Sequence, residues 1–568
     1  MRTSSFAQVF ASLCLPLLLA GCGDSTSTVD QGGAPDMARV VDLTGQRSGI
    51  GATCQSNRGV RGTCAGDDQV CVPDGRHGFP GGYCWQDCGA AACPADAECV
   101  RLGSGFDRCF ALCNTDADCR SGYACDDAKR CVPALGYYPG GSVRPGTKDG
   151  DACVATPPAA GAFEADQEVS ALNGAQTSLA VDEAHRNVVV VWSSLYANSI
   201  LAPKIGVATS DDGGKTFGPP LLLPTDGAVD FHSQHSAPSV AVDSTGTFYV
   251  AWVGQGGAPD DIYVARSNDG GVSFADVAVV TPRGESAADS LNYPSIAVGP
   301  AGTVYVAWTT ALAGQRTVRV SRSTDGGATW SDPVSVTNEA DKHEIARIAT
   351  SSDGSVYVAW FENHLDASVD FDQFGKNKIG LQKLTADLNP VGAAVIVSGT
   401  DPVPMDVPAL AVRGTNVFVA YTSGTGNGAW DIHVAASTNG GATMKAPVKV
   451  NGDASCATHL HPAAAVDAAG ILHVVYDDNR SLYDKDLGLD GRVFHTKATA
   501  ALGAGVLAFA ADEVVSKDPY AFTTEAGGPD WLGDYIGVAA TTAAHVYVSW
   551  ADPRTNSTSQ IFFTRSGF

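Results

Sequence analysis

The chain has 568 residues, of which 44% are hydrophobic, and this length is ample for a large globular domain. Its 61 acidic residues against 36 basic ones give a formal charge of −25, which argues against nucleic acid or an anionic surface as a general partner. The acidic excess is mostly Asp in turn-like stretches, as solvated loops and Asx-turns require.

Residues 1–22 have the pattern of a secretory signal. Arg2 supplies a short positive region, and residues 6–20 are apolar but too short to span a bilayer stably. The stretch LAGC at residues 19–22 resembles the lipobox of bacterial lipoproteins, which implies that Cys22 becomes the lipid-modified N-terminus. An ordinary signal peptide that is cleaved elsewhere is the alternative.

The rest of the sequence contains no other long apolar segment, so we expect a lipid anchor rather than a membrane-spanning helix. Gly23 follows Cys22, and by analogy with lipoproteins this favours the outer membrane. We therefore expect a lipid-anchored protein of the cell envelope, at the outer membrane or the cell surface. Residues 23–53 are rich in Gly, Ser, Thr and Asp and are expected to form a flexible tether.

Residues 54–135 are predicted to form a small disulfide-rich module, because high cysteine density in an exported protein indicates bridges that replace a core. The segment resembles EGF-like repeats weakly, at residues 113–125. Zinc binding would require reduced thiolates in compact pairs, which this compartment and these spacings disfavour. The spacing leaves the connectivity open, as it does the fate of Cys153 and Cys456. The twelve cysteines are Cys54, Cys64, Cys71, Cys84, Cys88, Cys93, Cys99, Cys109, Cys113, Cys119, Cys125 and Cys131.

Residues 136–162, rich in Pro and Gly, are expected to form a linker to a repeat domain at 163–568. This domain holds seven copies of a strand pair, spaced by about 50 to 75 residues, as in propeller blades. Each copy consists of short runs rich in Val, Ile, Tyr, Trp and Ala that are interrupted by turn residues. The copies start at Thr177, Pro238, Pro294, Ala346, Pro408, Pro462 and Tyr535.

The last copy ends inside its third strand, and residues 163–170 resemble a fourth strand that precedes the first copy. We infer that this N-terminal strand completes the last blade and closes the ring, which leaves only short, protected edges. The prediction is therefore an all-β, seven-bladed β-propeller, preceded by the disulfide-rich module. A six-bladed propeller is the alternative.

The turn between third and fourth strands recurs with the pattern Ser-x-Asp-Gly-Gly-x-Thr/Ser-aromatic. Its Asp can accept backbone hydrogen bonds within the turn, and its glycines permit positive φ. The pattern resembles the Asp-box (BNR) repeat of sialidases and their relatives, which implies a propeller blade and a structural role away from any active site. The defining positions are Ser210, Asp212, Gly214, Ser267, Asp269, Gly271, Ser323, Asp325, Gly327 and Trp330, with a weaker copy at residues 437–444.

The Asp-box turns lie on one face of the predicted propeller, and the long and varied connections between strands lie on the other face. Functional sites gather on variable loops over rigid scaffolds. We therefore expect the ligand at this face. The polar and aromatic residues expected there are Asp478, Asp534, Asp552 and Trp531. Asp478 and Asp552 each precede an Arg by two residues, and such pairs either hold a loop rigid or present a guanidinium to a carboxylate.

Two metal sites are also considered. His235, His343 and His459 occupy the same position before the first strands of alternate blades, and three imidazoles would suit zinc or another transition metal. The alternative is that each His bonds within its own loop. Asp484, Asp486 and Asp490 resemble an oxygen-rich calcium loop but lack the closing Glu. The candidate cofactors are therefore calcium and a transition metal, and the sequence assigns neither.

The resemblance to sialidases implies three arginines on a substrate carboxylate and a Tyr nucleophile activated by a Glu. Arg347, Arg480 and Arg554 could supply the guanidiniums, and Tyr535 with Glu525 the nucleophile pair. Glu344 and Glu362 are other candidate partners of Tyr535. However, the early arginine motif of sialidases is absent before Thr177, and seven blades exceed the six of these enzymes.

Three functions therefore remain. The first is a monomeric, surface-anchored binding protein, without catalysis, for an extracellular glycan or protein. The second is a sialidase-like exo-glycosidase, and the third is a metal-dependent propeller enzyme that rests on the histidines alone. Convergence of the arginines with Tyr535 would favour the second, and convergence of the histidines would favour the third.

Overall fold

The computed structural model describes most of the repeat domain and parts of the cysteine-rich module. The predictions for residues 1–53, Cys22 included, lie outside the described residues. The described residues are 69–72, 83–86, 92–101, 107–119, 123–125, 130–133, 159–170, 174–194, 204–223, 238–255, 260–281, 290–312, 315–337, 343–362, 377–399, 407–424, 430–453, 459–478, 491–503, 507–518, 520, 535–541, 545–552, 554 and 559–567. Within these ranges no helix is long and apolar enough to cross a membrane.

The described residues of the cysteine-rich module form three small antiparallel strand pairs, β1–β2, β3–β4 and β5–β6, and one short 3-10 helix. Disulfides join Cys93 to Cys109, Cys113 to Cys125 and Cys119 to Cys131. The module is therefore stabilised by bridges, as the cysteine density predicts. Its elements are β1 (Gln69–Val72), β2 (Tyr83–Gln86), β3 (Ala97–Arg101), β4 (Asp107–Ala111), η1 (Asp116–Asp118), β5 (Tyr123–Cys125) and β6 (Cys131–Pro133).

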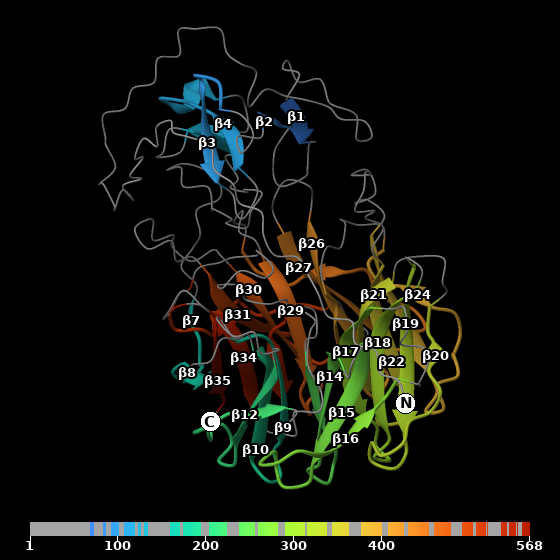
Figure 1. The fold of residues 1–568 in the computed structure, drawn as a ribbon. Coiled ribbons are helices and arrows are strands. Elements are labelled where there is room, and N and C mark those ends of the chain that lie inside the picture. Colours follow the sequence, from blue (N-terminus) through green and yellow to red (C-terminus); the bar gives the residue numbers. More distant parts are fainter. Residues whose placement is uncertain are drawn as a thin grey trace, which may run out of the picture. The chain divides into compact units, whose positions relative to one another are not determined.

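The repeat domain is an all-β propeller of seven sheets, which confirms the seven-bladed prediction and shows that the six-bladed alternative is wrong (Figure 1). Blades 1 to 3 consist of β9 (Gly174–Asp182), β10 (Asn187–Ser194), β11 (Lys204–Ser210), β12 (Leu221–Leu223); β13 (Ser239–Val242), β14 (Phe248–Gln255), β15 (Asp260–Ser267), β16 (Ala275–Val279); and β17 (Ser290–Val298), β18 (Val304–Leu312), β19 (Gln315–Ser323), β20 (Val334–Ser335). Blades 4 and 5 consist of β21 (His343–Thr350), β22 (Val356–Glu362), β23 (Lys378–Leu384), β24 (Val395–Ile396); and β25 (Ala409–Arg413), β26 (Asn416–Gly424), β27 (Trp430–Ser437), β28 (Val448–Lys449).

The last two blades both use strands from the N-terminal side of the domain. Blade 7 consists of β33 (Gly537–Ala540), β34 (Val546–Asp552) and β35 (Gln560–Ser566), and β8 (Gln167–Ser170) pairs antiparallel with β35. This pairing is the predicted ring closure. Blade 6 consists of β29 (His459–Val466), β30 (Leu472–Asp478), β31 (Arg492–Lys497) and β32 (Glu513–Val514). The strand β7 (Ala159–Ala160) lies in the predicted linker, residues 136–162. It pairs with β32 as a fifth, parallel strand of blade 6.

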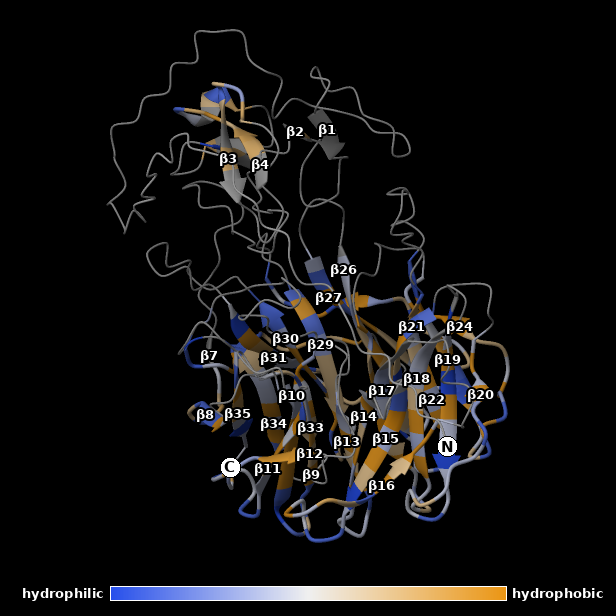
Figure 2. Cartoon of the chain, in the orientation of Figure 1, coloured by the Kyte–Doolittle hydropathy of each residue, from blue (hydrophilic) through white to orange (hydrophobic). Residues whose placement is uncertain are grey.

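The hydrophobic core consists of clusters between neighbouring blades. Among the described residues, seven clusters of buried side chains each combine two adjacent blades, and one of them joins blade 7 to blade 1. Large rings at one position of the second strand anchor several blades, namely Trp192, Trp252, Trp308 and Trp550. Figure 2 shows hydrophobic residues along the strands and hydrophilic residues at many of the turns. Each blade thus buries its faces only against its neighbours, so the ring must close.

The Asp-box turns have one hydrogen-bond pattern in all four copies. In blade 2, Ser267 Oγ donates to Asp269 Oδ1 over 2.7 Å and accepts the Gly271 N–H over 2.8 Å. Asp269 Oδ1 also accepts the Ser273 N–H over 3.0 Å. Gly271 has a φ of 93°, and a Cβ there would lie 2.5 Å from Val189 of blade 1, so the turn packs closely on the preceding blade.

We expect Ser267→Ala to reduce the free energy of unfolding by about 1–3 kcal/mol, because it leaves the buried Gly271 N–H without its acceptor. Ser267 is only 1% exposed, so water does not replace the hydroxyl. Urea unfolding of the full chain measures the effect. Ser273→Ala is the matched control, since Ser273 is exposed, and an equal loss in both variants would contradict this account.

Candidate functional site

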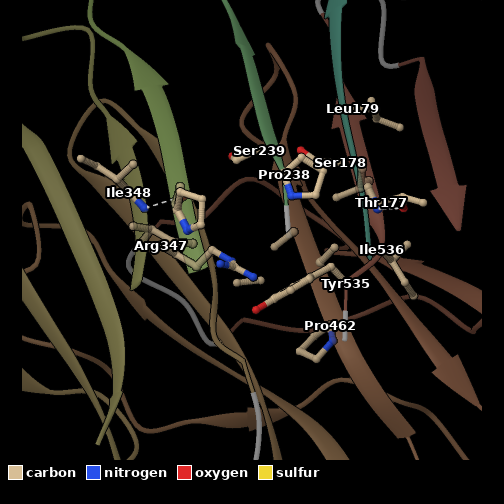
Figure 3. Close-up of a pocket in the computed structure, with 18 residues that line it drawn as sticks. Thr177, Ser178, Leu179, Pro238, Ser239, Arg347, Ile348, Pro462, Tyr535 and Ile536 are labelled. Carbon is tan, nitrogen blue, oxygen red and sulfur yellow. Dashed lines mark hydrogen bonds between the residues drawn. The ribbon is translucent and has the colours of Figure 1, made fainter. Parts of the chain in front are cut away.

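The candidate site is a cavity of about 190 Å³ in the central channel, lined by the first strands of all seven blades (Figure 3). At one position in this lining six blades carry a small residue, and blade 4 carries Arg347. The six small residues are Ser178, Ser239, Ser295, Ala409, Ala463 and Gly537. The internal repeat therefore marks Arg347 as a departure from the scaffold pattern.

The three serines at this position tie neighbouring blades together. Ser178 Oγ accepts the N–H of Val240 over 3.3 Å, and Ser239 Oγ accepts the N–H of Ile296 over 3.2 Å. Ser295 Oγ continues the series with the N–H of Ile348 in blade 4 over 3.2 Å. Arg347 ends this series at blade 4, and the residues at this position in blades 5 to 7, Ala409, Ala463 and Gly537, have no hydroxyl to continue it.

Arg347 instead reaches the opposite side of the channel. Its guanidinium lies 4.3 Å from the ring centroid of Tyr535 in blade 7, and its Nη1 donates to the Ala346 carbonyl over 3.1 Å. Figure 3 shows Arg347 and Tyr535 pointing toward each other. Tyr293 of blade 3 packs edge to face on Tyr535, with centroids 6.4 Å apart. Three blades thus bring one cation and two aromatic rings together.

The backbone at the start of the first strands is strained. Gln176, Tyr293, Ile345 and His461 occupy equivalent positions in blades 1, 3, 4 and 6, and all have φ between 53° and 60°. The register between first and second strand shifts at each of them, so each lies in a β-bulge. Such strain costs about 1–3 kcal/mol per residue and clusters at functional sites, where bulges redirect side chains.

A polar chain lies behind this position in blade 6. His461 Nδ1 lies 2.9 Å from Asp477 Oδ2, and the Tyr520 hydroxyl donates to Asp477 Oδ1 over 2.5 Å. Burial, together with the nearby Asp477 carboxylate, raises the pKa of Tyr520 well above its usual value. Tyr520 is therefore a neutral donor that fixes Asp477, and Asp477 in turn orients His461.

The predicted histidines lie in their own blades. His343 is buried and packs edge to face on Trp360 in blade 4, with centroids 5.9 Å apart. His459 is fully buried in blade 6, with Nδ1 2.6 Å from the Trp430 carbonyl oxygen. Its Nε2 lies 3.1 Å from Asp478 and 3.2 Å from Asp453. All these oxygens accept, so both ring nitrogens of His459 must donate, and the ring is an imidazolium.

Burial alone would lower the pKa of His459, but Asp478 and Asp453 outweigh it and raise this pKa to about 10. In this state the ring offers no lone pair to a metal ion. Among the described residues, the one group at metal-binding distances is Cys113, Cys119 and Cys131, all of which are disulfide-bonded. The three-histidine site stays a prediction, because His235 lies outside the described residues.

We expect His459→Gln to reduce the free energy of unfolding by about 1.5–3 kcal/mol near neutral pH, because charged hydrogen bonds between blades 5 and 6 are lost. The raised pKa stabilises the fold fully below pH 6.5, and this contribution disappears as the pH rises toward about 10. The deficit of the variant should therefore shrink in alkali. Urea unfolding near neutral pH and again toward about pH 10 tests this. The control is His185→Gln, because the side chain of His185 is exposed.

Arg554 lies in the ring closure rather than in the described cavity. It bonds Asp552 and Asp166 and stacks on Phe562, with 4.2 Å between the guanidinium carbon and the ring centroid. Of the predicted arginines, the structure thus brings Arg347 to Tyr535 and places Arg554 elsewhere. Glu344 and Glu362, the other candidate partners of Tyr535, form ion pairs with Arg316 and Lys378. The predictions for Arg480, Glu525, Asp534, Trp531, Asp484, Asp486 and Asp490 lie outside the described residues.

Sequence reasoning missed Tyr293 and the chain of His461, Asp477 and Tyr520. The signal for Tyr293 was weak, because nothing in the sequence says that blades 3 and 7 meet through it. The sequence holds a stronger signal for Arg347 than its place among three candidate arginines. Aligning the seven copies shows small residues at its position in every other blade.

No protein-family model and no curated protein matches the chain. Among solved structures, it is similar to a protein of unknown function from Dyadobacter fermentans, at 14% identity and a TM-score of 0.40 over 71% of this chain and 98% of that one. It is also similar to a Hadza microbial sialidase, Hz136, at 14% identity and a TM-score of 0.38 over 67% and 77% of the two chains. A GH93 α-L-arabinofuranosidase of Fusarium graminearum, in complex with arabinobiose, matches at 13% identity and a TM-score of 0.39 over 71% and 98%. At such identities the similarity concerns the fold alone.

Proposed function

We propose that the channel mouth binds a carboxylate-bearing sugar of an extracellular glycan, in a lipid-anchored receptor of the cell envelope. The observation that supports this is the contact between Arg347 and Tyr535 inside the cavity. A guanidinium pairs with a carboxylate through two parallel hydrogen bonds. Beside the guanidinium, the ring of Tyr535, which lines the cavity, and the ring of Tyr293, which packs on it, supply apolar surface for a sugar ring.

The position of Arg347 strengthens the argument. A Ser in its place would bond the next blade, as in blades 1 to 3, whereas the arginine places its guanidinium in the cavity. An arginine over an aromatic ring in a small cavity is also preorganised, because the ring limits its freedom before ligand arrives. Among the described residues that line the cavity, Arg347 is the one charged side chain, so the lining offers a carboxylate a single guanidinium.

Sialidase-like hydrolysis is the second candidate, and the same contact favours it. Tyr535, which gives its proton to a base, would attack the anomeric carbon as the glycosidic bond breaks and the leaving oxygen takes up a proton, and water would then release the sugar from Tyr535. Arg347 would hold the substrate carboxylate. The described glutamates Glu344 and Glu362 are engaged in ion pairs, so the base would have to be Glu525 or another residue. Binding without catalysis needs no such partner, and we therefore prefer it.

The experiment is a binding screen of the full chain against saccharides that end in sialic acid, in a uronic acid or in a neutral sugar, together with turnover of a fluorogenic sialoside. We expect binding of acidic members and no turnover. Turnover that EDTA does not change and that Tyr535→Phe abolishes would establish the hydrolase instead. Turnover that EDTA abolishes would indicate the metal-dependent enzyme. Equal binding of acidic and neutral members would refute the carboxylate proposal.

A further inference from the structure

A line of polar groups crosses blade 6 from an inner turn to the N-terminal segment. His473 Nε2 lies 3.4 Å from Asp467 Oδ2, and its Nδ1 lies 3.1 Å from His495 Nε2. His495 Nδ1 lies 2.7 Å from Glu513 Oε1, and Glu513 Oε2 accepts the N–H of Ala162 over 3.0 Å. These groups come from the β29–β30 turn, β30, β31, β32 and the segment that carries β7.

The line is buried and packed against the N-terminal segment. The side chains of His473 and His495 are each 3% exposed, and their rings stack with centroids 5.3 Å apart. Phe163 packs edge to face on His495, with centroids 5.4 Å apart. Residues 159–163 therefore contact blade 6 through β7, through the Ala162 N–H and through Phe163, immediately before β8 closes blade 7.

The geometry fixes how many protons the two rings carry. Carboxylates only accept, so Asp467 and Glu513 each need an N–H from the histidine that faces them. The bond between the two rings needs a third N–H. Two neutral imidazoles have only two, so all three hydrogen bonds are made together only when the pair of His473 and His495 holds one extra proton.

A second extra proton would break this arrangement. It would place two N–H groups face to face over 3.1 Å, and two cations would meet in a buried site. Burial first, and then the neighbouring His495, lowers the pKa of His473 to about 4, although Asp467 opposes this. Lys497 on β31 adds to the lowering. Among the described residues, the charged groups that act on the pair are Asp467, Lys497 and Glu513.

We propose that His473 and His495 form an acid-sensitive latch, which holds residues 159–163 on blade 6, directly before the ring-closing strand β8, and releases them when both rings are protonated. Protonation breaks the bond between the rings and leaves two cations whose facing nitrogens lie 3.1 Å apart, and His495 relieves their repulsion by moving away from His473. This movement displaces Glu513 and Phe163, which both contact His495, and so loosens the bond between Glu513 and the Ala162 N–H. The ring-closing strand β8 is thereby freed at its N-terminal side. The latch is independent of sugar binding, so either proposal can fail alone.

The direction of the pH effect follows from proton counting. A histidine of the unfolded chain takes up its proton near pH 6.5, whereas folded His473 stays neutral down to about pH 4. The unfolded or released state thus binds more protons in this interval, so acid weakens the latch progressively as the pH falls through it.

Hydrogen exchange of the full chain, corrected for the intrinsic pH dependence of exchange, tests the latch. Between about pH 7 and about pH 4 we expect protection of residues 159–170 to fall at least tenfold. His473→Gln should abolish this fall, because its amide can accept from His495 and donate to Asp467 but takes up no proton. His185→Gln, at a side chain that is 60% exposed, is the matched control and should behave as the parent.

The latch is refuted if His473→Gln loses protection with acid as the parent does. It is equally refuted if residues 159–170 of the parent keep their protection as the pH falls. The same holds if they lose it only together with β16 of blade 2, a strand that does not contact the latch. This internal comparison needs no variant, so it decides even if His473→Gln does not fold.

Discussion

Arg347→Ser is expected to weaken binding of an acidic saccharide by about 10- to 100-fold while the protein stays folded. The variant removes the only charge among the residues that line the described cavity. At the same time it places a Ser where blades 1 to 3 already have one. Its hydroxyl should accept the N–H of Leu410 in blade 5, as Ser295 Oγ accepts that of Ile348. The loss is measured by calorimetric titration with the acidic saccharide that binds best in the screen.

Arg322→Met is the matched control for charge. Arg322 lies on the outside of blade 3, where it bonds the Ala386 carbonyl and Asp387, and it should leave binding unchanged. Thermal unfolding of Arg347→Ser should show a Tm equal to or above that of the parent. If Arg347→Ser binds the acidic sugar as the parent does, Arg347 is not the carboxylate partner and the proposed site is wrong.

Arg554→Met is expected to reduce the free energy of unfolding by about 3–5 kcal/mol, because it leaves two buried carboxylates without their cation. Asp552 is fully buried and Asp166 is 5% exposed. These residues join β34 to the N-terminal segment that closes the ring, so the loss should appear first as exposure of residues 163–170. Urea unfolding of the full chain gives the magnitude, and limited proteolysis locates the opening.

The pH dependence identifies the cause of this effect. Burial raises the pKa of Asp552 even with Arg554 present, which opposes the rise. Without Arg554 the pKa of Asp552 should rise further, so the carboxyl becomes neutral sooner as the pH falls. The deficit of Arg554→Met should thus be largest near neutral pH and smaller in acid. Arg266→Met, at a partly exposed ion pair with Asp276, is the control and should cost at most about 1 kcal/mol.

The fold was largely predictable because each blade repeats a local pattern. The alternation of strand and turn residues defines four strands per copy, and the truncated last copy requires a strand from elsewhere, which β8 supplies. The strand β7 was not predictable, since two alanines after a Pro-rich stretch carry no strand signal. Cysteine spacing likewise predicted a bridged module but not its pairing, such as Cys113 with Cys125.

The candidate site was predictable only in part, because it joins residues of non-adjacent blades. Sequence spacing gives the place of a residue within a blade, so Arg347 and Tyr535 could be assigned to equivalent regions. Which side chains meet depends on the diameter of the ring and on side-chain length, and sequence spacing gives neither. Tyr293 therefore contacts Tyr535 without a sequence signal, and Arg554, a predicted site residue, pairs with Asp166 instead. The partners of His459 and His473 lie in the same blade or the next one, but sequence spacing does not say which side chains a turn or a strand pair brings face to face.

The most direct test of the account is a calorimetric comparison of matched saccharides on the full chain, each with and without its terminal acidic sugar. Sialyllactose against lactose and a uronate-terminated oligosaccharide against its neutral counterpart are suitable pairs. The account predicts that in at least one pair the acidic member binds at least tenfold more tightly, and that this preference vanishes with Arg347→Ser. Equal affinities within both pairs, or a preference that Arg347→Ser retains, would contradict it.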